Sequence, residues 1–386
     1  MTTMKKILCV LSLAALLTAC GGGAEKTSAA PDNGDVIKIG GIIPKTGSAA
    51  VYGNSADKGV KLAVEEINAA GGIGGKQIEY LSEDDKGDPT EAVTVYNKLV
   101  EGGNNVIIGA ITSKPSLAVA ENSSQDGIPI ITPTGTSAPI TENKDNVFRT
   151  CFTDPLQGKI LANFACDNLK AKTVAILRNT SNDYSNGVAD AFIEQAKSKG
   201  LEVVADEGYG DSDVDFKVQL TNIDKEKPDV IIVPEYYEKD VSIIKQARDL
   251  GIESKIIGPD GWDGVLAVID EGSKDLLNGV YFTNHYSVHD TSEKVQNFVN
   301  AYKEKYNEDP SAFSALGYDT VYIYKEAIEK SASMDFAEIV KALKSVEVSG
   351  VTGDLRFGEN NNPVKSATII EIKDGSYTFN SLVSAE

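Results

Sequence analysis

The sequence has 386 residues and a formal net charge of −20, from 37 Lys and Arg against 57 Asp and Glu. So acidic a chain repels phosphate backbones, which argues against a nucleic-acid partner. Some 350 residues follow the first 35, about right for two lobes of roughly 120 to 200 residues and too many for one core.

The first residues have the features of a secretory leader. Two lysines precede an apolar run from Ile7 to Leu17, which is too short to span a bilayer. The run closes with Leu-Thr-Ala-Cys, which resembles a bacterial lipobox ending at Cys20. We therefore expect residues 1–19 to be a lipoprotein signal peptide, Cys20 to carry a lipid, and the Gly- and Ser-containing residues 20–35 to form a flexible tether. An ordinary secretory peptide with an incidental cysteine is the alternative.

From Val36 onward, short β-branched runs alternate with amphipathic segments, which is the pattern of βαβ units in a parallel sheet. The first unit has a strand at Val36–Ile43 and a helix with apolar residues at i, i+3, i+4 and i+7 from Val60. The elements expected next are a strand around 78–80, a helix beginning at Pro89, a strand at 106–108, a helix from about 114 and a strand at 128–132.

A second series repeats this architecture without a sequence repeat. It predicts helices at 156 onward, 187–199, 216–223 and 239–250, and strands at 173–177, 201–204, 229–233, 255–257 and 280–283. Helices at 292–306 and 312–330 follow, and then a hairpin turn at Asp374-Gly375. The fold class is α/β, with two doubly wound lobes. Since the tail must complete one lobe or both, the chain crosses between lobes more than once.

Only Cys151 and Cys166 lie in the body of the chain. A helix-like stretch separates them by about four turns, or roughly 20 Å, which is beyond disulfide reach. We predict two free core thiols.

Ligands of open parallel sheets lie beyond the carboxyl ends of the strands. The strand at 106–108 is followed by a loop that ends in Ser113, whose hydroxyl would cap the next helix and suit a carboxylate. The next strand ends in a second hydroxyl-rich stretch, Thr132–Thr136. For Ser113 alone, capping remains the alternative. Two adjacent hydroxyl-rich loops favour a ligand carboxylate.

An amino-acid ligand also needs a partner for its ammonium group. Asp260 follows the strand at 255–257 in the second series and could face Ser113 across a cleft. A turn aspartate before glycine is the alternative. Four aromatic residues fall in predicted loops after strands, where they could wall an apolar pocket, although each alone suits packing equally well. They are Tyr52, Tyr184, Tyr236 and Trp262.

Other motifs fail on their spacing. The run Asp211–Asp215 resembles the start of a calcium loop, but Phe216 and Asn222 replace the required glycine and glutamate. The two histidines, His285 and His289, have no further zinc ligand nearby in the sequence. The sequence also lacks a Walker loop, a nucleophile elbow and a dinucleotide fingerprint. We expect no metal, no cofactor and no catalysis.

Taken together, these segments resemble the type I periplasmic binding proteins of branched-chain amino acid ABC importers, over essentially the whole mature chain. The likeness rests on residues 38–52, 65–79 and 234–262 and on the pair Tyr318-Asp319. The family's disulfide is missing, because no cysteine lies between residues 86 and 112. The resemblance implies a lobe of residues 36–154 plus 285–362 and a lobe of residues 155–284 plus 363–386, joined by three crossing segments.

The resemblance also assigns roles to site residues. Ser113 and Thr136 would bind the ligand carboxylate, and Thr134 would bind the ammonium through its carbonyl, next to Gly135. Asp260 stands where the family often has glutamate as the ammonium partner. The residues implied around the rest of the ligand are Tyr184 and Tyr236 from the second lobe, Tyr52 and Phe313 at the side-chain pocket, and Trp262, which would reduce its volume.

The function implied is that of a lipid-anchored, monomeric protein outside the cytoplasmic membrane. It would capture a branched-chain or similar small amino acid and deliver it to the permease of an ABC importer. Three alternatives stay open: the same fold with another ligand, such as an amide, an aromatic acid or another amino acid; a ligand-sensing domain; and a hydrolase or metal enzyme of the cell envelope.

Overall fold

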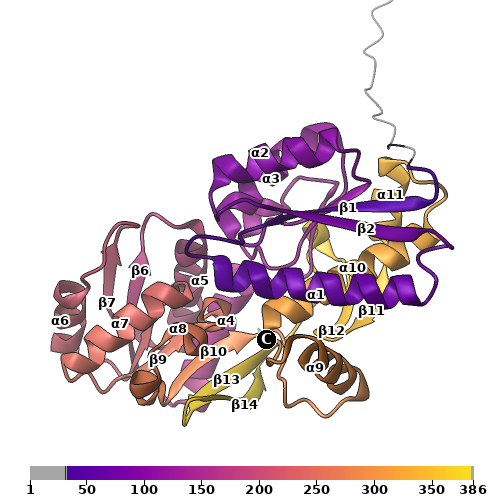
Figure 1. The fold of residues 1–386 in the computed structure, drawn as a ribbon. Coiled ribbons are helices and arrows are strands. Elements are labelled where there is room, and N and C mark those ends of the chain that lie inside the picture. Colours follow the sequence, from indigo (N-terminus) through magenta and orange to yellow (C-terminus); the bar gives the residue numbers. More distant parts are fainter. Residues whose placement is uncertain (1–30, 32, 384–386) are drawn as a thin grey trace, which may run out of the picture.

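The computed structural model describes residue 31 and residues 33–383 (Figure 1). The predicted leader and the lipidation motif at Cys20 lie outside the described residues, so they stay predictions. The described chain forms two lobes, each built around a central β-sheet that is covered by helices.

Lobe 1 is built on a five-stranded parallel sheet in the order β2-β1-β3-β4-β5. Its strands are short β-branched runs whose inner members are buried on both faces, as in other helix-covered parallel sheets. They are β1 (Val36–Ile43), β2 (Gln77–Asp84), β3 (Val106–Ile108), β4 (Ile130–Thr132) and β5 (Val147–Arg149). The helices of this lobe are α1 (Ala50–Ala69), α2 (Pro89–Glu101), α3 (Ser113–Asp126), α9 (Glu293–Tyr306), α10 (Ala312–Lys330) and α11 (Phe336–Leu343).

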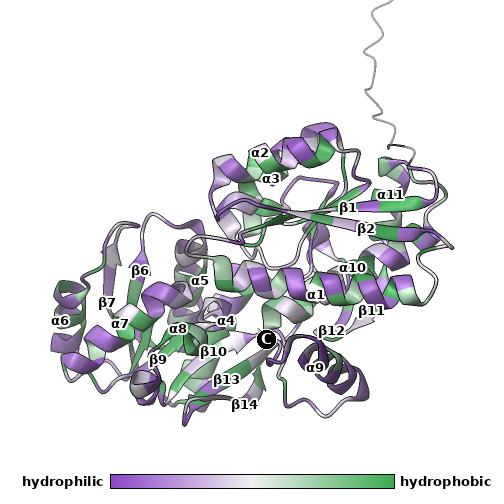
Figure 2. Cartoon of the chain, viewed as in Figure 1, coloured by the Kyte–Doolittle hydropathy of each residue, from purple (hydrophilic) through white to green (hydrophobic). Residues whose placement is uncertain are grey.

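Lobe 2 is built on a seven-stranded sheet in the order β14-β13-β10-β9-β8-β6-β7, in which β13 pairs antiparallel with both of its neighbours and alone runs against the other strands. Its strands are β6 (Thr173–Asn179), β7 (Glu202–Tyr209), β8 (Val230–Ile232), β9 (Lys255–Gly258), β10 (Val280–Asn284), β13 (Ala367–Lys373) and β14 (Ser376–Val383). Its helices are α4 (Asp154–Asn163), α5 (Asp183–Lys199), α6 (Lys217–Glu226), α7 (Tyr237–Asp249) and α8 (Val265–Val268). In Figure 2 the helices are banded in green and purple, as amphipathic helices on a sheet are.

The predicted α/β class and the alternation of strands and helices are confirmed, and so is the hairpin turn at Asp374-Gly375, which joins β13 to β14. Four features escape sequence-based prediction: β5, α8, α11 and the hairpin of β11 (Glu347–Gly350) and β12 (Gly353–Arg356).

The chain crosses between the sheets three times. It passes to the second sheet between β5 and β6, returns after β10, and passes again between β12 and β13. The lobe boundaries predicted at residues 154, 284 and 362 fall in these stretches, although the exact boundaries stay a prediction. Segments far apart in the sequence therefore meet in each lobe, above all α1 and α10 (Figure 1).

Cys151 and Cys166 are both free, as predicted, but only Cys151 is a core thiol, because Cys166 is half-buried. Burial raises the pKa of the Cys151 thiol to about 12, so the thiol is protonated at neutral pH. Among the described residues, no helix combines the length and apolar character that crossing a membrane requires.

Helices α1 and α10 approach each other at two glycines. A Cβ atom on Gly59 would lie 1.9 Å from the carbonyl oxygen of Ser314, and one on Gly317 would lie 2.5 Å from that of Ala56. Side chains at either position would force the helices apart. This contact matters for function because both helices send residues into the cleft between the lobes from their first turns.

We therefore expect Gly59→Ala to lower the free energy of unfolding by about 1–3 kcal/mol, the usual penalty of overpacking. Helix propensity alone would predict that the substitution raises the free energy of unfolding by up to about 1 kcal/mol. Urea unfolding measures the difference. Gly272→Ala is the control, because a Cβ there meets nothing within 4 Å. A stabilised Gly59→Ala variant would contradict the packing described.

Candidate ligand-binding site

A small cavity lies between the lobes, beyond the carboxyl ends of strands from both sheets. It brings together eight of the ten predicted site residues, and Gly135 and Trp262 lie outside it. Its volume of about 10 Å³ is room for one water molecule at most. An amino acid could therefore reach it only if the lobes separate or the lining side chains move. The lining consists of Tyr52, Ile111, Thr112, Ser113, Thr134, Thr136, Tyr184, Tyr236, Asp260, Gly261 and Phe313.

The lobe 1 side of the cavity is rich in hydroxyl groups. The prediction that Ser113 caps a helix is wrong, because Thr112 is the N-cap of α3 and Ser113 is its first residue. The Ser113 hydroxyl instead accepts a hydrogen bond from the N–H of Ser137 at 3.3 Å. Within the described chain, no side chain caps the first turn of α3. The N–H groups of that turn therefore suit a carboxylate.

The loop that carries Thr134 and Thr136 is held from behind by a buried cation. Arg149 in β5 donates to the carbonyl of Gly135 at 2.8 Å and to that of Ser137 at 2.9 Å. The N–H of Gly135 donates to the hydroxyl of Thr132 at 2.8 Å. A Cβ on Gly135 would lie 2.7 Å from that hydroxyl, so no larger residue fits. Gly135 thus positions its two neighbours without lining the cavity.

Asp260, in lobe 2, is only 3 % exposed and is surrounded by donors. Its Oδ1 accepts from the amide of Gln157 at 3.0 Å and from the hydroxyl of Tyr184 at 2.8 Å. Its Oδ2 lies 3.1 Å from Nε2 of His285. These partners lie in α4, in α5 and in the segment after β10, all distant from Asp260 in the sequence. Sequence reasoning identified Asp260 but did not identify its partners Gln157 and His285.

His285 is neutral in this arrangement. Its ring is buried and stacks on Phe152 with centroids 3.7 Å apart. Burial lowers the pKa of His285, and the neighbouring Asp260 only partly offsets this effect. Since a carboxylate can only accept, Nε2 carries the proton, and Nδ1 has no partner among the described residues. His285 therefore acts as a hydrogen-bond donor to Asp260.

A second carboxylate beside the cavity, Asp154 in the first turn of α4, is one that sequence reasoning missed. It is 1 % exposed, its N–H donates to the carbonyl of Thr136, and neither carboxylate oxygen has a partner among the described residues. Burial raises the pKa of Asp154 well above its ordinary value and the nearby Asp260 adds to the shift, while the side chains of Thr136, Arg149 and Gln157 offset it only in part. An unpaired buried carboxylate is unfavourable, so this site is suited to a cation.

Four aromatic rings form a continuous wall across the two lobes. The ring of Tyr184 stacks on that of Tyr236 at 4.8 Å, Tyr236 meets Tyr52 edge-on at 5.8 Å, and Tyr52 stacks on Phe313 at 4.1 Å. The prediction that Tyr52 and Tyr184 lie in loops is wrong. Both sit in first helical turns, those of α1 and α5, because these helices begin earlier than their apolar periods indicate.

Trp262 lies outside the cavity, contrary to expectation. It is fully buried in the core of lobe 2, and its indole N–H donates to the carbonyl of Val233 at 2.9 Å. The ring packs over Gly258, where any Cβ would lie 2.0 Å from the indole nitrogen. It therefore supports the turn that carries Asp260 rather than narrowing the cavity.

Reciprocal tyrosine contacts join the two lobes. The hydroxyl of Tyr52 donates to the carbonyl of Gly261 and accepts from the N–H of Tyr237 at 3.1 Å. In return the hydroxyl of Tyr237 accepts from the N–H of Val51 at 3.4 Å. At the exposed edge, Lys114 and Asp211 lie 4.0 Å apart. These contacts exist only while the lobes are together.

The acidic run at 211–215 is explained by local structure. Asp213 accepts from the N–H of Gly210 at 2.8 Å, and Asp215 accepts from that of Lys217 at 3.0 Å. Within residues 33–383 no group of three or more His, Cys, Asp or Glu is placed to hold a metal ion.

Comparison with known proteins agrees with this architecture. The chain matches the periplasmic binding protein family model over residues 36–376. The Leu/Ile/Val-binding protein BraC3 of Rhizobium johnstonii is 33% identical over 328 residues, which cover 84% of this chain and 88% of that protein.

Two crystal structures are similar throughout. The substrate-binding protein LivJ of Streptococcus pneumoniae, in complex with isoleucine, is 36% identical, with a TM-score of 0.84 over 90% of this chain and 99% of its own. The leucine-binding protein LivK of Thermotoga maritima is 32% identical, with a TM-score of 0.85 and the same coverage. The chain therefore belongs to the periplasmic binding protein family and is a relative of its leucine-, isoleucine- and valine-binding members.

Proposed function

We propose that the protein captures leucine, isoleucine or valine between its lobes and delivers it to an ABC importer. The observation that carries the proposal is that two buried carboxyl groups, those of Asp154 and Asp260, and the hydroxyl groups of Ser113 and Thr136 surround the same cavity. A ligand with an ammonium at one end and a carboxylate at the other matches this distribution of charge. The branched-chain ligands that the relatives' names give support the same class.

Each part of such a ligand has partners in the site. Its carboxylate would accept from the hydroxyls of Ser113 and Thr136 and from the first turn of α3. Its ammonium would lie between Asp154 and Asp260 and donate to the carbonyl of Thr134. Its apolar side chain would lie against the aromatic wall. The carboxylate oxygens of Asp154, which accept no hydrogen bond within the described chain, would gain a donor when the ligand binds.

Closure would then report that the protein is loaded. The cavity of about 10 Å³ is too small for leucine to diffuse in between closed lobes. A ligand that contacts both lobes stabilises the closed arrangement by its differential affinity for it. The permease would recognise the closed arrangement.

The same proposal covers location and chemistry. The family's members bind solutes and are not enzymes, and we infer that this chain likewise catalyses nothing. We place it outside the cytoplasmic membrane as a monomer, with Cys20 carrying a lipid. This part rests on the leader-like residues 1–19 and on kinship.

Calorimetry of the refolded, ligand-stripped protein against the amino acids, several amides and benzoate tests the ligand. Leucine has about nine heavy atoms, and at roughly 1 kcal/mol each a micromolar or tighter Kd is attainable. Asp260→Asn and Asp154→Asn should each raise the Kd by about 30-fold or more, because truncating one partner of a buried charge pair costs about 2–5 kcal/mol.

Asp275→Asn is the control in this experiment, because it changes an exposed carboxylate that is remote from the cavity. It should leave the Kd unchanged. Binding only of ligands that lack an ammonium group would contradict the amino-acid assignment.

Tyr237→Phe tests whether contacts between the lobes set affinity. The ring beside Tyr52 is kept, and only the hydroxyl that accepts from Val51 is lost. One hydrogen bond contributes about 1 kcal/mol, so leucine should dissociate about five times faster in stopped-flow measurements, with little change in association.

The control is Tyr324→Phe, which removes a hydroxyl that bonds the carbonyl of Ile107 inside lobe 1. It should destabilise the fold without changing the dissociation rate. Equal effects of the two variants on that rate would show that the Tyr237 hydroxyl has no special part in closure.

A further inference from the structure

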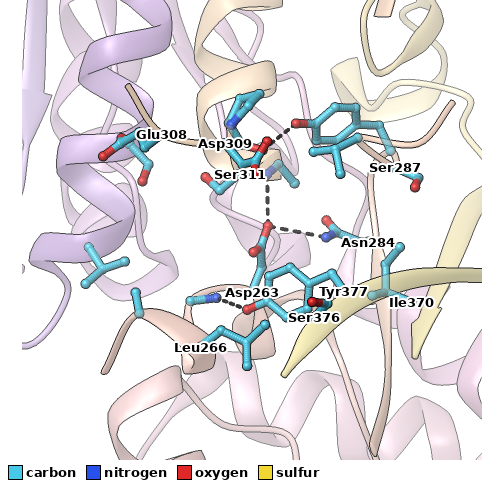
Figure 3. A pocket seen from close by; sticks show the side chains of 18 of the residues that line it. Asp263, Leu266, Asn284, Ser287, Glu308, Asp309, Ser311, Ile370, Ser376 and Tyr377 are labelled. Atoms are coloured by element: carbon cyan, nitrogen blue, oxygen red, sulfur yellow. Dashed lines mark hydrogen bonds between the residues drawn. The ribbon is translucent and has the colours of Figure 1, made fainter. Parts of the chain in front are cut away.

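A second and much larger hollow lies between the lobes, where the chain crosses after β10 (Figure 3). Its volume is about 730 Å³, within the usual range for small-molecule sites. It shares no lining residue with the cavity described above. We call it the hinge groove.

Both lobes build the walls of the hinge groove. Lobe 1 contributes the first turns of α1, from Ala50 to Lys58, and the segment 308–312 before α10. Lobe 2 contributes α8 and the turn between β13 and β14, and the crossing segment 284–289 lies between them. A molecule in the groove would contact both lobes and the segment that connects them.

Two lysines at the groove form ion pairs with two carboxylates, and one further carboxylate has no ion-pair partner. Lys58 pairs with Glu308 at 2.6 Å, and Lys303 pairs with Asp309 at 2.5 Å. The remaining carboxylate is Asp263, which lies near the centre of Figure 3. Among the described residues, no Lys, Arg or His lies within ion-pair distance of it. The groove therefore has one carboxylate without a cationic partner.

Asp263 is 3 % exposed and is held by neutral donors. Its Oδ2 accepts from the N–H of Ala312 at 2.8 Å and from the amide of Asn284 at 3.3 Å (Figure 3). Burial raises the pKa of Asp263 to about 6, so the group is mostly ionised at neutral pH. A cation in the groove would supply the charge partner that these donors do not.

We propose that the hinge groove binds a small organic ammonium ion with a short apolar body. The ammonium would pair with Asp263, and the body would lie on the apolar part of the lining. That part consists of Val51, Leu266, Ala267, Val288, Ile370 and the ring of Tyr377. An anion is disfavoured because both lysines at the groove are already paired, and a metal ion is disfavoured by the presence of a single uncommitted carboxylate.

Because the groove has walls from both lobes, its occupant would favour the arrangement seen here. By linkage it would then tighten binding of leucine, and leucine would tighten binding of the amine by the same factor. This coupling rests on the proposed function, whereas binding of the amine does not.

The test is calorimetry of the whole mature chain with isoamylamine, and with isoamyl alcohol as a neutral probe of the same shape. We expect saturable one-to-one binding of the amine, at least ten times tighter than that of the alcohol. Asp263→Asn should abolish this preference while keeping an acceptor for Ala312. Ala267→Trp, at an exposed position of the groove wall, should block binding without touching Asp263.

Isoamylamine also resembles the ammonium end of leucine, so the two sites must be separated. Binding should persist in Asp260→Asn and in protein saturated with leucine. Absence of binding, equal binding of the alcohol, or loss of binding in Asp260→Asn would each overturn the proposal. If leucine fails to bind, the proposed function is wrong. Binding of the amine at the hinge groove would still be decided by the comparison with the alcohol and with Asp263→Asn.

Discussion

A carboxylate removed from water must be surrounded by donors or paired with a cation, and two such groups lie side by side between these lobes. Asp260 accepts hydrogen bonds from Gln157, Tyr184 and His285. Asp154 has no comparable partner among the described residues. From this contrast we infer that a ligand ammonium lies at the two carboxyl groups and that its carboxylate lies at the hydroxyls of Ser113 and Thr136. The other features of the site serve to hold this arrangement in place.

The site residues are held in place by elements that are distant from one another in the sequence. The loop with Thr134 and Thr136 is fixed by the buried Arg149, and the turn with Asp260 rests on Trp262. The rings of Tyr52 and Phe313 enter from α1 and α10, which meet at glycines more than 250 residues apart. Because these supports belong to different lobes, the site is complete only while the lobes are together, and we therefore infer that affinity depends on closure.

Much of this could be predicted from the sequence, because alternating elements place strand ends at one edge of a sheet. Ser113, Thr136 and Asp260 follow three strands with clear patterns, and all three line the cavity. Asp154 could not be found in this way, since an aspartate before proline at the start of a helix has an ordinary local explanation. That its carboxylate oxygens are buried and accept no hydrogen bond depends on the tertiary packing around it.

Trp262 shows the opposite error, because a tryptophan after a strand suggests a pocket wall until its close packing on Gly258 is known.

The central claim is that a ligand ammonium completes the surroundings of Asp154. A crystal structure of the leucine complex tests it most directly. The account predicts the leucine nitrogen within about 3 Å of carboxylate oxygens of both Asp154 and Asp260. A complex in which the nitrogen contacts Asp260 alone, with Asp154 still unpaired, would contradict it.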